Sequence, residues 1–490
     1  MPDLQERWSQ GVAVRRLTHV IRAFLPVFVS ACGPSVQVQA DLTRPTVQIG
    51  VGQINLASFV QNFTVESLAR IGEDGKLVER LAKRWIVSPD GLSLIVELRP
   101  AVTFHDGSPV SASLVAEALN SNLPATMGPA LDDVLSVQPI SEDRVEIRLR
   151  RPSRFALEAL ETTISKPGAP TIGTAAFVAT DVPGEMRAND NYYLGPPTVE
   201  RVVARIFPGV RAAWAEFLRG GVDMIYEVGP DARDSLESST AIKLFPYTRH
   251  YQFMVLLSFQ NGAARSSAIR RALNAAIDRT AFVKDAMASH GLPSSGPIWP
   301  RHWAAQGNLP TFSFDPKAAA ATIASVGHPT RFTCLVAPAD ERVALVVKRQ
   351  LQAIGVEMIL KEGSIQDNAR AIRAGTFDAV IAASVSGPSL LRPYDWWHSK
   401  GTRNSSKYAN ASVDAALDTI RHARSDDEYQ KGVEAFQRGI LEDPPAIFLA
   451  WDERVRAVSK RFDVPAQPDV DMMGTLRLWR IASKDARSRN

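Results

Sequence analysis

The densest group of side chains that could hold a small molecule lies in the sequence LRPYDWW, directly after an apolar segment that is typical of a strand. A cation, an acid and three aromatic residues fall close together there: Arg392, Tyr394, Asp395, Trp396 and Trp397. A guanidinium binds a carboxylate or phosphate through two parallel hydrogen bonds, and aromatic rings cover the apolar parts of a ligand. We therefore expect a loop here that contacts a ligand. The alternative is that both tryptophans pack in the protein core.

Motifs that would indicate catalysis are missing from the sequence. It contains no HExxH, GxSxG or P-loop pattern, and no GxGxxG after a strand. The eight histidines are dispersed, without the spacing of metal ligands. We therefore expect a binding protein rather than an enzyme, with no cofactor and no metal site.

Length and composition indicate a protein of several domains. The 490 residues are too many for one hydrophobic core, so two or three domains are expected. The net charge of +4 comes from 56 basic and 52 acidic residues scattered along the chain. Because there is no run of Lys and Arg with interleaved aromatics, nucleic acid is not an expected partner.

The N-terminus has the features of an export signal. An apolar run over residues 23–31 follows three arginines and is shorter than the roughly 20 residues that a membrane-spanning helix needs. Pro26 within the run, and the acidic Asp3 and Glu6 near the start, depart from this pattern. We expect residues 1–32 to be a signal peptide.

The two cysteines have different expected roles. Cys32 ends the sequence VSAC, which resembles the lipobox of bacterial lipoproteins, so we expect Cys32 to be lipidated; plain secretion is the alternative. Residues 33–45 are polar and would form a tether. Cys334 lies in the apolar segment RFTCLV, which is typical of a buried strand.

Periodicity outlines the secondary structure. Strand-like alternation occurs at residues 46–51, 92–98, 144–149 and 201–207. Helices are expected over residues 55–85, 211–219 and 264–290. Within the first of these, Leu81, Ala82 and Trp85 have the spacing of one helix face.

The most regular section indicates an α/β fold. Asp315 and Pro316 are typical of the N-cap and first position of a helix. A strand near 331–337, a helix over 341–354 and a strand at 356–360 follow. This alternation predicts a mostly parallel sheet with crossover helices, in which ligands bind beyond the carboxyl ends of the strands.

Several short motifs, in a fixed order, resemble one protein family. Residues 77–119 contain LAxxW, DG, LR and FHDGSP, an order similar to that in the family 5 extracytoplasmic solute-binding proteins, the receptors of dipeptide, oligopeptide and nickel ABC importers. Further similar segments are GTAAF at 173–177, NDNYYLG at 189–195, GVD at 221–223, IRRAL with AIDR within 269–279, and EDPP at 442–445. The chain is identified as a member of that family.

The resemblance implies a two-lobe periplasmic binding protein fold of type II, cluster C, which closes by hinge bending. Lobe I would combine residues 46–250 and 453–485, and lobe II would be residues 256–446. Crossing segments near 251–253 and 446–449 would act as hinges. The segment between Leu149 and Gly173 is shorter than expected, so the extra subdomain of lobe I is expected to be trimmed.

The ligand would lie in the cleft between the lobes. Besides the LRPYDWW segment, the residues expected to line it are Gln53, Asn55, Thr174, Tyr251 and Phe253. In peptide-binding members, an aspartate of the matching loop pairs with the peptide amino terminus. Here Arg392 occupies that position, with Asp395 as a possible substitute. If Arg392 faces the cleft, it favours a carboxylate or phosphate.

The resemblance also implies the function. The protein would be the extracytoplasmic substrate-binding protein of an ABC importer, capturing a peptide or similar small polar solute and delivering it to a permease and ATPase complex. Alternatives are a receptor that feeds a sensor or recycling system, and a nickel-chelate, sugar or organic-acid receptor. The protein would be a monomer in the periplasm or at the cell surface, reaching the membrane only through its lipid anchor.

Overall fold

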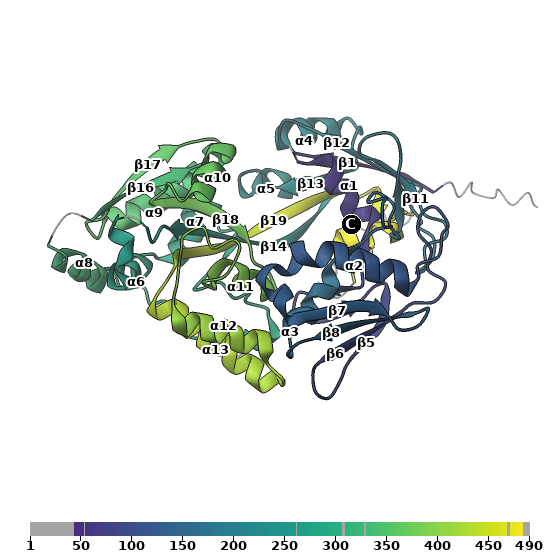
Figure 1. The fold of residues 1–490 in the computed structure, drawn as a ribbon. Coiled ribbons are helices and arrows are strands. Elements are labelled where there is room, and N and C mark those ends of the chain that lie inside the picture. Colours follow the sequence, from purple (N-terminus) through teal and green to yellow (C-terminus); the bar gives the residue numbers. More distant parts are fainter. Residues whose placement is uncertain are drawn as a thin grey trace, which may run out of the picture. The chain divides into compact units, whose positions relative to one another are not determined.

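The computed structural model describes residues 44–52, 54–260, 262–305, 309–327, 330–467 and 471–483 (Figure 1). The expected signal peptide with Cys32, most of the expected tether, and Gln53 lie outside these ranges. Within them, no helix is both long and apolar enough to cross a membrane.

One mixed sheet runs through the structure. In spatial order its strands are β10 (Phe177–Ala179), β11 (Glu185–Ala188), β12 (Arg201–Ile206), β1 (Thr46–Val51), β13 (Met224–Val228), β19 (Ala446–Ser459), β14 (Ile242–Leu257), β18 (Ala379–Val385), β16 (Arg331–Val336) and β17 (Glu357–Glu362), with β15 (Gly291–Pro293) paired to β19. β1 is parallel to β12 and β13, and β16 is parallel to β17 and β18. We call β10, β11, β12, β1 and β13, with their helices, the β1 half. We call β18, β16 and β17, with their helices, the β16 half.

The long antiparallel strands β14 and β19 join the two halves, and we call this pair the ribbon (Figure 1). Residues 242–248 of β14 pair with 453–459 of β19, and residues 252–256 pair with 446–451. The register shifts between Thr248 and Gln252, so residues 249–251 have no partner in β19. A bulge of this kind bends a strand and re-aims its side chains.

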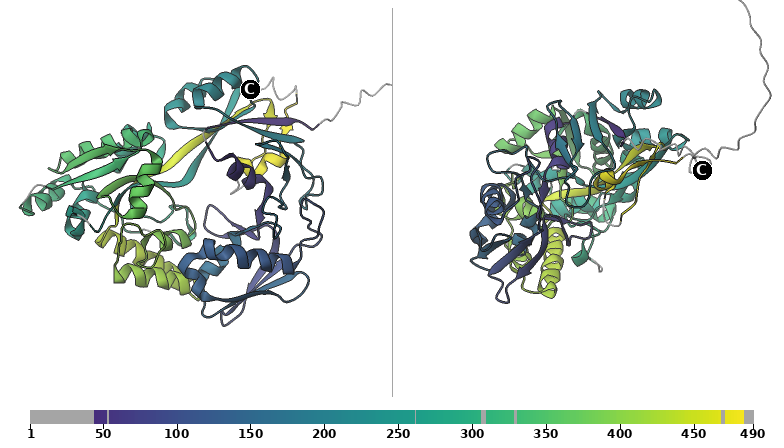
Figure 2. Two further views of the ribbon diagram at one scale, coloured as in Figure 1. Left: turned by 45° about the horizontal axis from the view of Figure 1, so that its top comes forward. Right: turned by 90° about the vertical axis from the view of Figure 1, so that its right-hand side faces the viewer.

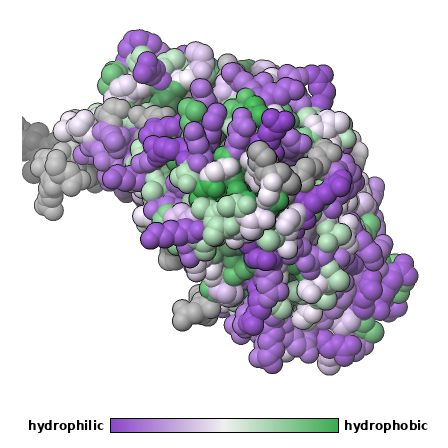
Figure 3. Space-filling view, turned by 90° about the vertical axis from the view of Figure 1, so that its left-hand side faces the viewer, coloured by the Kyte–Doolittle hydropathy of each residue, from purple (hydrophilic) through white to green (hydrophobic). Residues whose placement is uncertain are grey.

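Helices cover both halves of the sheet. The β1 half carries α1 (Leu56–Thr64), α4 (Val210–Leu218) and α5 (Pro230–Glu237), and the β16 half carries α6 (Ser267–Ala275), α7 (Arg279–Met287), α8 (Pro316–Ser325), α9 (Glu341–Gln352) and α10 (Ile365–Ala374). Each half has its own buried apolar clusters. Seen from the side of α8 and β17, the surface is mostly hydrophilic around a smaller apolar area (Figure 3).

Residues 66–164 form a separate layer, which we call the small-sheet unit. Its antiparallel sheet has the order β5 (Ala82–Val87), β6 (Ser93–Leu98), β8 (Arg144–Leu149) and β7 (Val134–Pro139), and α2 (Ala112–Met127) covers one face. The unit also contains β2 (Glu66–Ser67), β3 (Ala69–Ile71), β4 (Leu77–Glu79), α3 (Arg154–Glu158) and β9 (Thr163–Ile164). Its apolar core is continuous with the core beneath three helices of the β16 half: α11 (Leu391–Trp397), α12 (Ala411–His422) and α13 (Asp426–Glu442).

Short elements complete the chain. β20 (Phe462–Asp463) pairs with β21 (Arg480–Ile481). Single-turn and 3₁₀ helices lie at Gly128–Asp133, Ala159–Glu161, Gly262–Arg265, Trp303–Ala305, Pro338–Asp340 and Met472–Leu478.

The helix predicted over residues 55–85 is wrong beyond Thr64, because β2 to β5 follow α1. The three-residue spacing of Ala82 and Trp85 has another cause. A register shift between Ala82 and Arg84 inserts one residue into β5, so Ala82 pairs with Leu98 and Trp85 with Val96. Since alternate residues of a strand share a face, the bulge puts Ala82 and Trp85 on the same side.

Candidate functional site

A cavity of about 1440 Å³ lies where the β1 half, the ribbon and the β16 half meet. The carboxyl ends of β1 and β13 open into it, as expected for parallel strands. The bulge of β14 and the neighbouring part of β19 form another wall, and Arg301, Val385 and Arg392 contribute from the β16 half. The cavity exceeds the roughly 300–1,000 Å³ that is usual for small-molecule sites, so it has room for a ligand with bound water.

The cavity lining contains charged groups of both signs. Its cations and acids are Arg70, Arg249, Arg301, Arg392, Arg454 and Arg456, with Glu73, Glu227, Glu453 and Asp471. Tyrosines 226, 247 and 251 lie among them. A surface of this composition binds polar groups by charge-assisted hydrogen bonds and covers apolar parts with rings.

Asp452 holds two of the arginines in place. Its side chain is 1% exposed, and its Oδ2 accepts hydrogen bonds from Arg249 Nη1 at 3.2 Å and Arg454 Nε at 2.7 Å. Burial raises the pKa of Asp452, and the two guanidinium groups oppose this effect. The Arg249 guanidinium lies 4.0 Å from the centre of the Tyr251 ring. Side chains therefore fix the bulge, where ladder hydrogen bonds to β19 are interrupted.

Arg456 lies against two aromatic rings. Its guanidinium carbon is 4.5 Å from the ring centre of Tyr226 and 4.2 Å from that of Tyr247. It donates to Asp471 at 2.7 Å and to the Tyr226 carbonyl at 3.2 Å. Alternation along the ribbon explains the grouping, because Tyr247 pairs with Arg454, and residues two apart share a face.

The turn after β3 forms a further wall. The Glu73 carboxylate lies 3.0 Å from His250 Nε2 and 3.5 Å from Arg301. Trp299 Nε1 donates to the Glu73 carbonyl at 2.8 Å, and the His250 ring meets Trp299 edge-on. These contacts place the turn beside the bulge.

Two of the predicted site residues line the cavity: Arg392 and Tyr251. Arg392 projects from α11 and donates to Glu161 at 3.3 Å and to the Ser386 carbonyl at 3.4 Å. Tyr251 belongs to the bulge of β14. The structure thus brings together a cation and a ring that lie far apart in the sequence.

The other predicted ligand contacts of the LRPYDWW segment, Tyr394, Asp395, Trp396 and Trp397, do not line this cavity. The segment is a helix, α11, and its rotation directs Tyr394 and Trp397 into the core and packs Trp396 against it. Asp395 accepts hydrogen bonds from the Thr402 backbone N–H at 2.7 Å and its hydroxyl at 2.6 Å. The alternative, that the tryptophans pack in the core, fits this arrangement.

The other predicted residues have local structural roles, and Gln53 lies outside the described residues. Asn55 caps α1, accepting from Ser58 N at 3.1 Å. Phe253 is buried in the core of the β16 half. Thr174 donates to Glu66 at 3.2 Å, which ties the small-sheet unit to the β1 half.

Most of the charged lining is not predicted from the sequence. It includes Arg249, Arg454 and Arg456, together with Tyr226 and Tyr247. The sequence does contain a signal for these residues, because aromatic and basic side chains alternate in FPYTRHY at 245–251 and basic ones in ERVR at 453–456, as in strands with one polar face. Among the described residues, no group of three His, Cys, Asp or Glu side chains is arranged to hold a metal ion.

Comparison with known proteins identifies the family. Residues 76–406 match the family described as bacterial extracellular solute-binding proteins, family 5. The protein belongs to this family. This confirms the predicted family and the role of a substrate-binding protein of an ABC importer.

This family 5 solute-binding protein has curated relatives along most of its length. The glutathione-binding protein GsiB of Pectobacterium atrosepticum is 22% identical, with 83% of this chain and 86% of the relative covered. The oligopeptide-binding protein AppA of Bacillus subtilis is 22% identical, with 86% and 87% covered.

Solved structures confirm the predicted fold class. NikA from Brucella suis, in complex with Fe(III)-EDTA, superposes with a TM-score of 0.79 at 17% identity, covering 89% of this chain and 100% of that chain. NikZ from Campylobacter jejuni, in complex with Ni(L-His), gives a TM-score of 0.77 at 20% identity, covering 89% and 99%. These likenesses establish the two-lobe solute-binding architecture.

Proposed function

We propose that this receptor captures a small peptide, or a solute of similar size with both a carboxylate and an ammonium group, in the cavity beside the bulge. The observation that carries the proposal is the lining of six guanidinium and four carboxylate groups around three tyrosines. Relatives named for glutathione and oligopeptide binding support the same ligand class.

Arg392 is the proposed partner of a ligand carboxylate. Its side chain is 33% exposed, and its two hydrogen bonds within the protein are long, at 3.3 and 3.4 Å. A guanidinium has five N–H donors, so most of them remain for a ligand. Arg301, which is also in the lining, is the second candidate.

The acids of the lining are the proposed partners of a ligand ammonium group. Glu227 accepts from the Tyr247 hydroxyl at 3.1 Å and lies 3.5 Å from Arg249. These contacts hold its carboxylate at the cavity wall. Tyr251 would cover an apolar part of the ligand with its ring.

The bulge at residues 249–251 is the proposed hinge. The ladder is interrupted there on β14, so bending costs few backbone hydrogen bonds. This position overlaps the predicted hinge near 251–253. The register shifts again between Phe253 and Met254, so Leu449, within the other predicted hinge segment at 446–449, has no partner in β14. The lobes themselves are proposed as predicted: residues 46–250 with 453–485, and residues 256–446.

Further proposals concern the export, the membrane anchor and the oligomeric state of the protein. The receptor would be exported by the signal peptide, anchored through a lipid on Cys32 in the periplasm or at the cell surface, and would work as a monomer. These follow from the N-terminal sequence and the family resemblance.

Native mass spectrometry of the purified full chain tests the proposed ligand. We expect an additional mass that is lost on unfolding and belongs to a peptide-like compound. Arg392→Ala should then reduce the affinity for that compound at least tenfold, the effect of one lost charge-assisted hydrogen bond of about 1.5–3 kcal/mol. Arg349→Ala, which removes an exposed arginine of α9, is the matched control. Equal affinities in the two variants would refute the role of Arg392.

A further inference from the structure

A turn of the small-sheet unit reaches the cavity wall. The small-sheet unit lies against the β16 half away from the ribbon (Figure 2), and the turn between its strands β3 and β4 carries Glu73, which lines the cavity. Arg301, which follows β15 in the chain, is also part of the lining. Its Nη1 lies 3.5 Å from Glu73 Oε2. An acid and a cation from distant parts of the sequence are therefore paired at the wall.

Hydrogen bonds hold the turn that carries Glu73 in one conformation. Within the turn, Lys76 N donates to the Asp74 carboxylate at 3.0 Å. From the segment that precedes Arg301 and continues after it, Trp299 Nε1 donates to the Glu73 carbonyl and Trp303 N to the Asp74 carbonyl, both at 2.8 Å. Groups that are already in place bind a ligand at little cost in chain entropy, so this turn presents a preorganised carboxylate.

The Glu73 carboxylate has unused hydrogen-bonding capacity. Its Oε1 lies 3.0 Å from His250 Nε2, whereas its Oε2 is buried and receives no hydrogen bond from the described residues. Arg301 approaches this oxygen only as an ion pair at 3.5 Å. Because buried polar atoms nearly always have a hydrogen-bond partner, an unpaired carboxylate oxygen at a cavity wall indicates a donor that the ligand supplies.

The other three carboxylates of the lining are already engaged. Each accepts a hydrogen bond from a hydroxyl or a guanidinium group: Glu227 from Tyr247, Glu453 from Arg233, and Asp471 from Arg456. Of these four described carboxylates, Glu73 is the one with a buried oxygen that lacks a hydrogen bond. Glu73 is therefore the best placed of the lining acids to accept from a ligand ammonium group.

Arg301 has donors left for a ligand carboxylate. Its side chain is 52% exposed, and its Nη2 donates to the Thr248 hydroxyl at 3.1 Å. The guanidinium carbon lies 5.7 Å from the centre of the Trp299 ring, which restricts its orientation. Since a guanidinium carries five N–H donors, most of them remain for a ligand.

The spacing of this pair favours one arrangement of charges in the ligand. In an α-amino carboxylate, one carbon carries both groups, so the nitrogen and the carboxylate oxygens are about 3 Å apart. This distance is close to the 3.5 Å between Glu73 Oε2 and Arg301 Nη1. In an extended dipeptide, the terminal ammonium and carboxylate groups are about 7 Å apart, too far to contact both partners at once.

We propose that Glu73 and Arg301 bind the α-amino carboxylate head group of the ligand, with the ammonium on Glu73 and the carboxylate on Arg301. The ligand class is then a solute in which one carbon carries a free ammonium and a free carboxylate. The cavity of about 1440 Å³ has room for a longer polar chain beyond this head group, extending toward Arg392 and the tyrosines. This inference rests on the proposed function, which makes the cavity the ligand site, and it narrows the ligand class.

Two isomeric tripeptides test the ligand class by isothermal titration calorimetry of the full chain. In γ-L-glutamyl-L-alanyl-glycine, the α-carbon of the glutamyl residue keeps both its ammonium and its carboxylate free. In α-L-glutamyl-L-alanyl-glycine, that carboxyl group is part of the peptide bond, although composition and net charge are the same. The γ isomer should bind about tenfold more tightly or better, the effect of one charge-assisted hydrogen bond. Equal affinities, or tighter binding of the α isomer, would overturn the proposal.

One variant tests each residue through the group that it binds. Arg301→Met should remove the preference for the γ isomer, because the carboxylate loses its partner. N-acetylation of the γ isomer, which removes the ammonium charge, should weaken its binding to the wild type about tenfold or more but should not weaken binding to Glu73→Gln. Arg349→Met, which removes an exposed arginine of α9, should keep both wild-type ratios.

These ratios separate ligand recognition from a general loss of stability, because each compares two ligands on the same protein. Wild-type ratios in both Arg301→Met and Glu73→Gln would overturn the assignment of the head group to these residues.

The inference and the proposed function fail in different ways. If the two isomers bind equally well, the head group is wrong, but the receptor still takes peptides and the proposed function stands. If neither isomer binds, the inference is overturned, and native mass spectrometry decides separately whether the cavity holds a peptide-like compound.

Discussion

His302 should make the receptor less stable in mild acid. Its ring is 1% exposed, stacked with Trp303 and Tyr429, and its Nδ1 accepts a hydrogen bond from Ala304 N at 3.1 Å. Burial lowers the pKa of His302 from 6.5 to about 4, although Asp74 opposes the shift. The folded protein therefore keeps this ring neutral at a pH where the unfolded chain protonates it.

The sign and size of the effect follow from proton linkage. Between the pKa of 6.5 in the unfolded chain and about 4 in the folded protein, the unfolded state binds more protons, so the free energy of unfolding decreases as the pH falls. One pKa unit corresponds to about 1.4 kcal/mol, so His302 should remove roughly 2 kcal/mol of stability between pH 7.5 and pH 5.

Urea unfolding followed by tryptophan fluorescence, at pH 7.5 and pH 5, measures this difference. His302→Phe keeps a ring, and His302→Asn keeps an acceptor for Ala304 N, but neither side chain titrates. Both variants should lose about 2 kcal/mol less than the wild type between the two pH values, whatever their stability at pH 7.5. The reasoning is refuted if both variants retain the pH dependence of the wild type.

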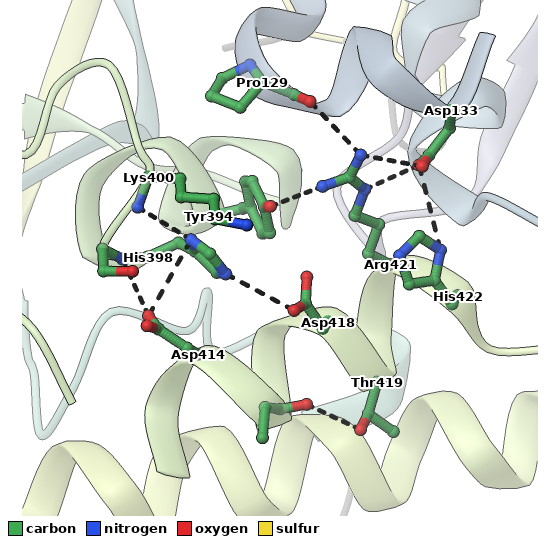
Figure 4. A network of polar contacts seen from close by, with 12 residues as sticks. Pro129, Asp133, Tyr394, His398, Lys400, Asp414, Asp418, Thr419, Arg421 and His422 are labelled. Atoms are coloured by element: carbon green, nitrogen blue, oxygen red, sulfur yellow. Dashed lines mark hydrogen bonds and ion pairs between the residues drawn. The ribbon is translucent and has the colours of Figure 1, made fainter. Parts of the chain in front are cut away.

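Three substitutions test packing. Gly173→Ala should lower the free energy of unfolding in urea by more than about 2 kcal/mol, because the added Cβ would lie 2.0 Å from a backbone oxygen. Gly209→Ala, whose Cβ would meet open space, should change the free energy of unfolding little. Equal effects of the two substitutions would contradict this reasoning. Arg421→Met should cost at least about 2 kcal/mol because the buried carboxylate of Asp133 loses its hydrogen bonds from Arg421 (Figure 4) and keeps Arg151 as a partner. The exposed Arg349→Met should cost under about 1 kcal/mol. Trp397→Ala should cost about 3–5 kcal/mol without changing ligand affinity, and weaker binding in isothermal titration would return Trp397 to the site.

Local signals in the sequence predicted the elements that depend on local physics. The helix start at Asp315 is confirmed, because its side chain accepts from Ala318 N at 2.9 Å. The strand at residues 144–149 alternates because one face of β8 is buried under α2. A cap hydrogen bond and the alternation of a half-buried strand both leave a pattern in the local sequence, so they can be predicted without the rest of the fold.

Features that depend on partners distant in the sequence could not be predicted in this way. The bulge in β5 is visible only against β6, so Ala82 and Trp85 gave a false helical spacing. The sequence places Arg392 and its aromatic neighbours together, and only the rotation of α11 decides that Arg392 lines the cavity whereas Tyr394 and Trp397 lie in the core. Arg249 comes together with Arg454 and Arg456 only because β14 pairs with β19, a strand about two hundred residues later in the chain.

The ribbon also determines the order in which the protein can fold. β19 pairs with both β13 and β14, yet it begins at Ala446, after the whole β16 half has been made. The β16 half is therefore inserted in the chain between the neighbouring strands β14 and β19. The sheet lacks β19, the strand between β13 and β14, until the last tenth of the chain has been made. Pairings this distant in sequence form slowly because a long loop must close first. A chain cut before Ala446 would leave β13 and β14 with exposed edges, ready to pair with other chains.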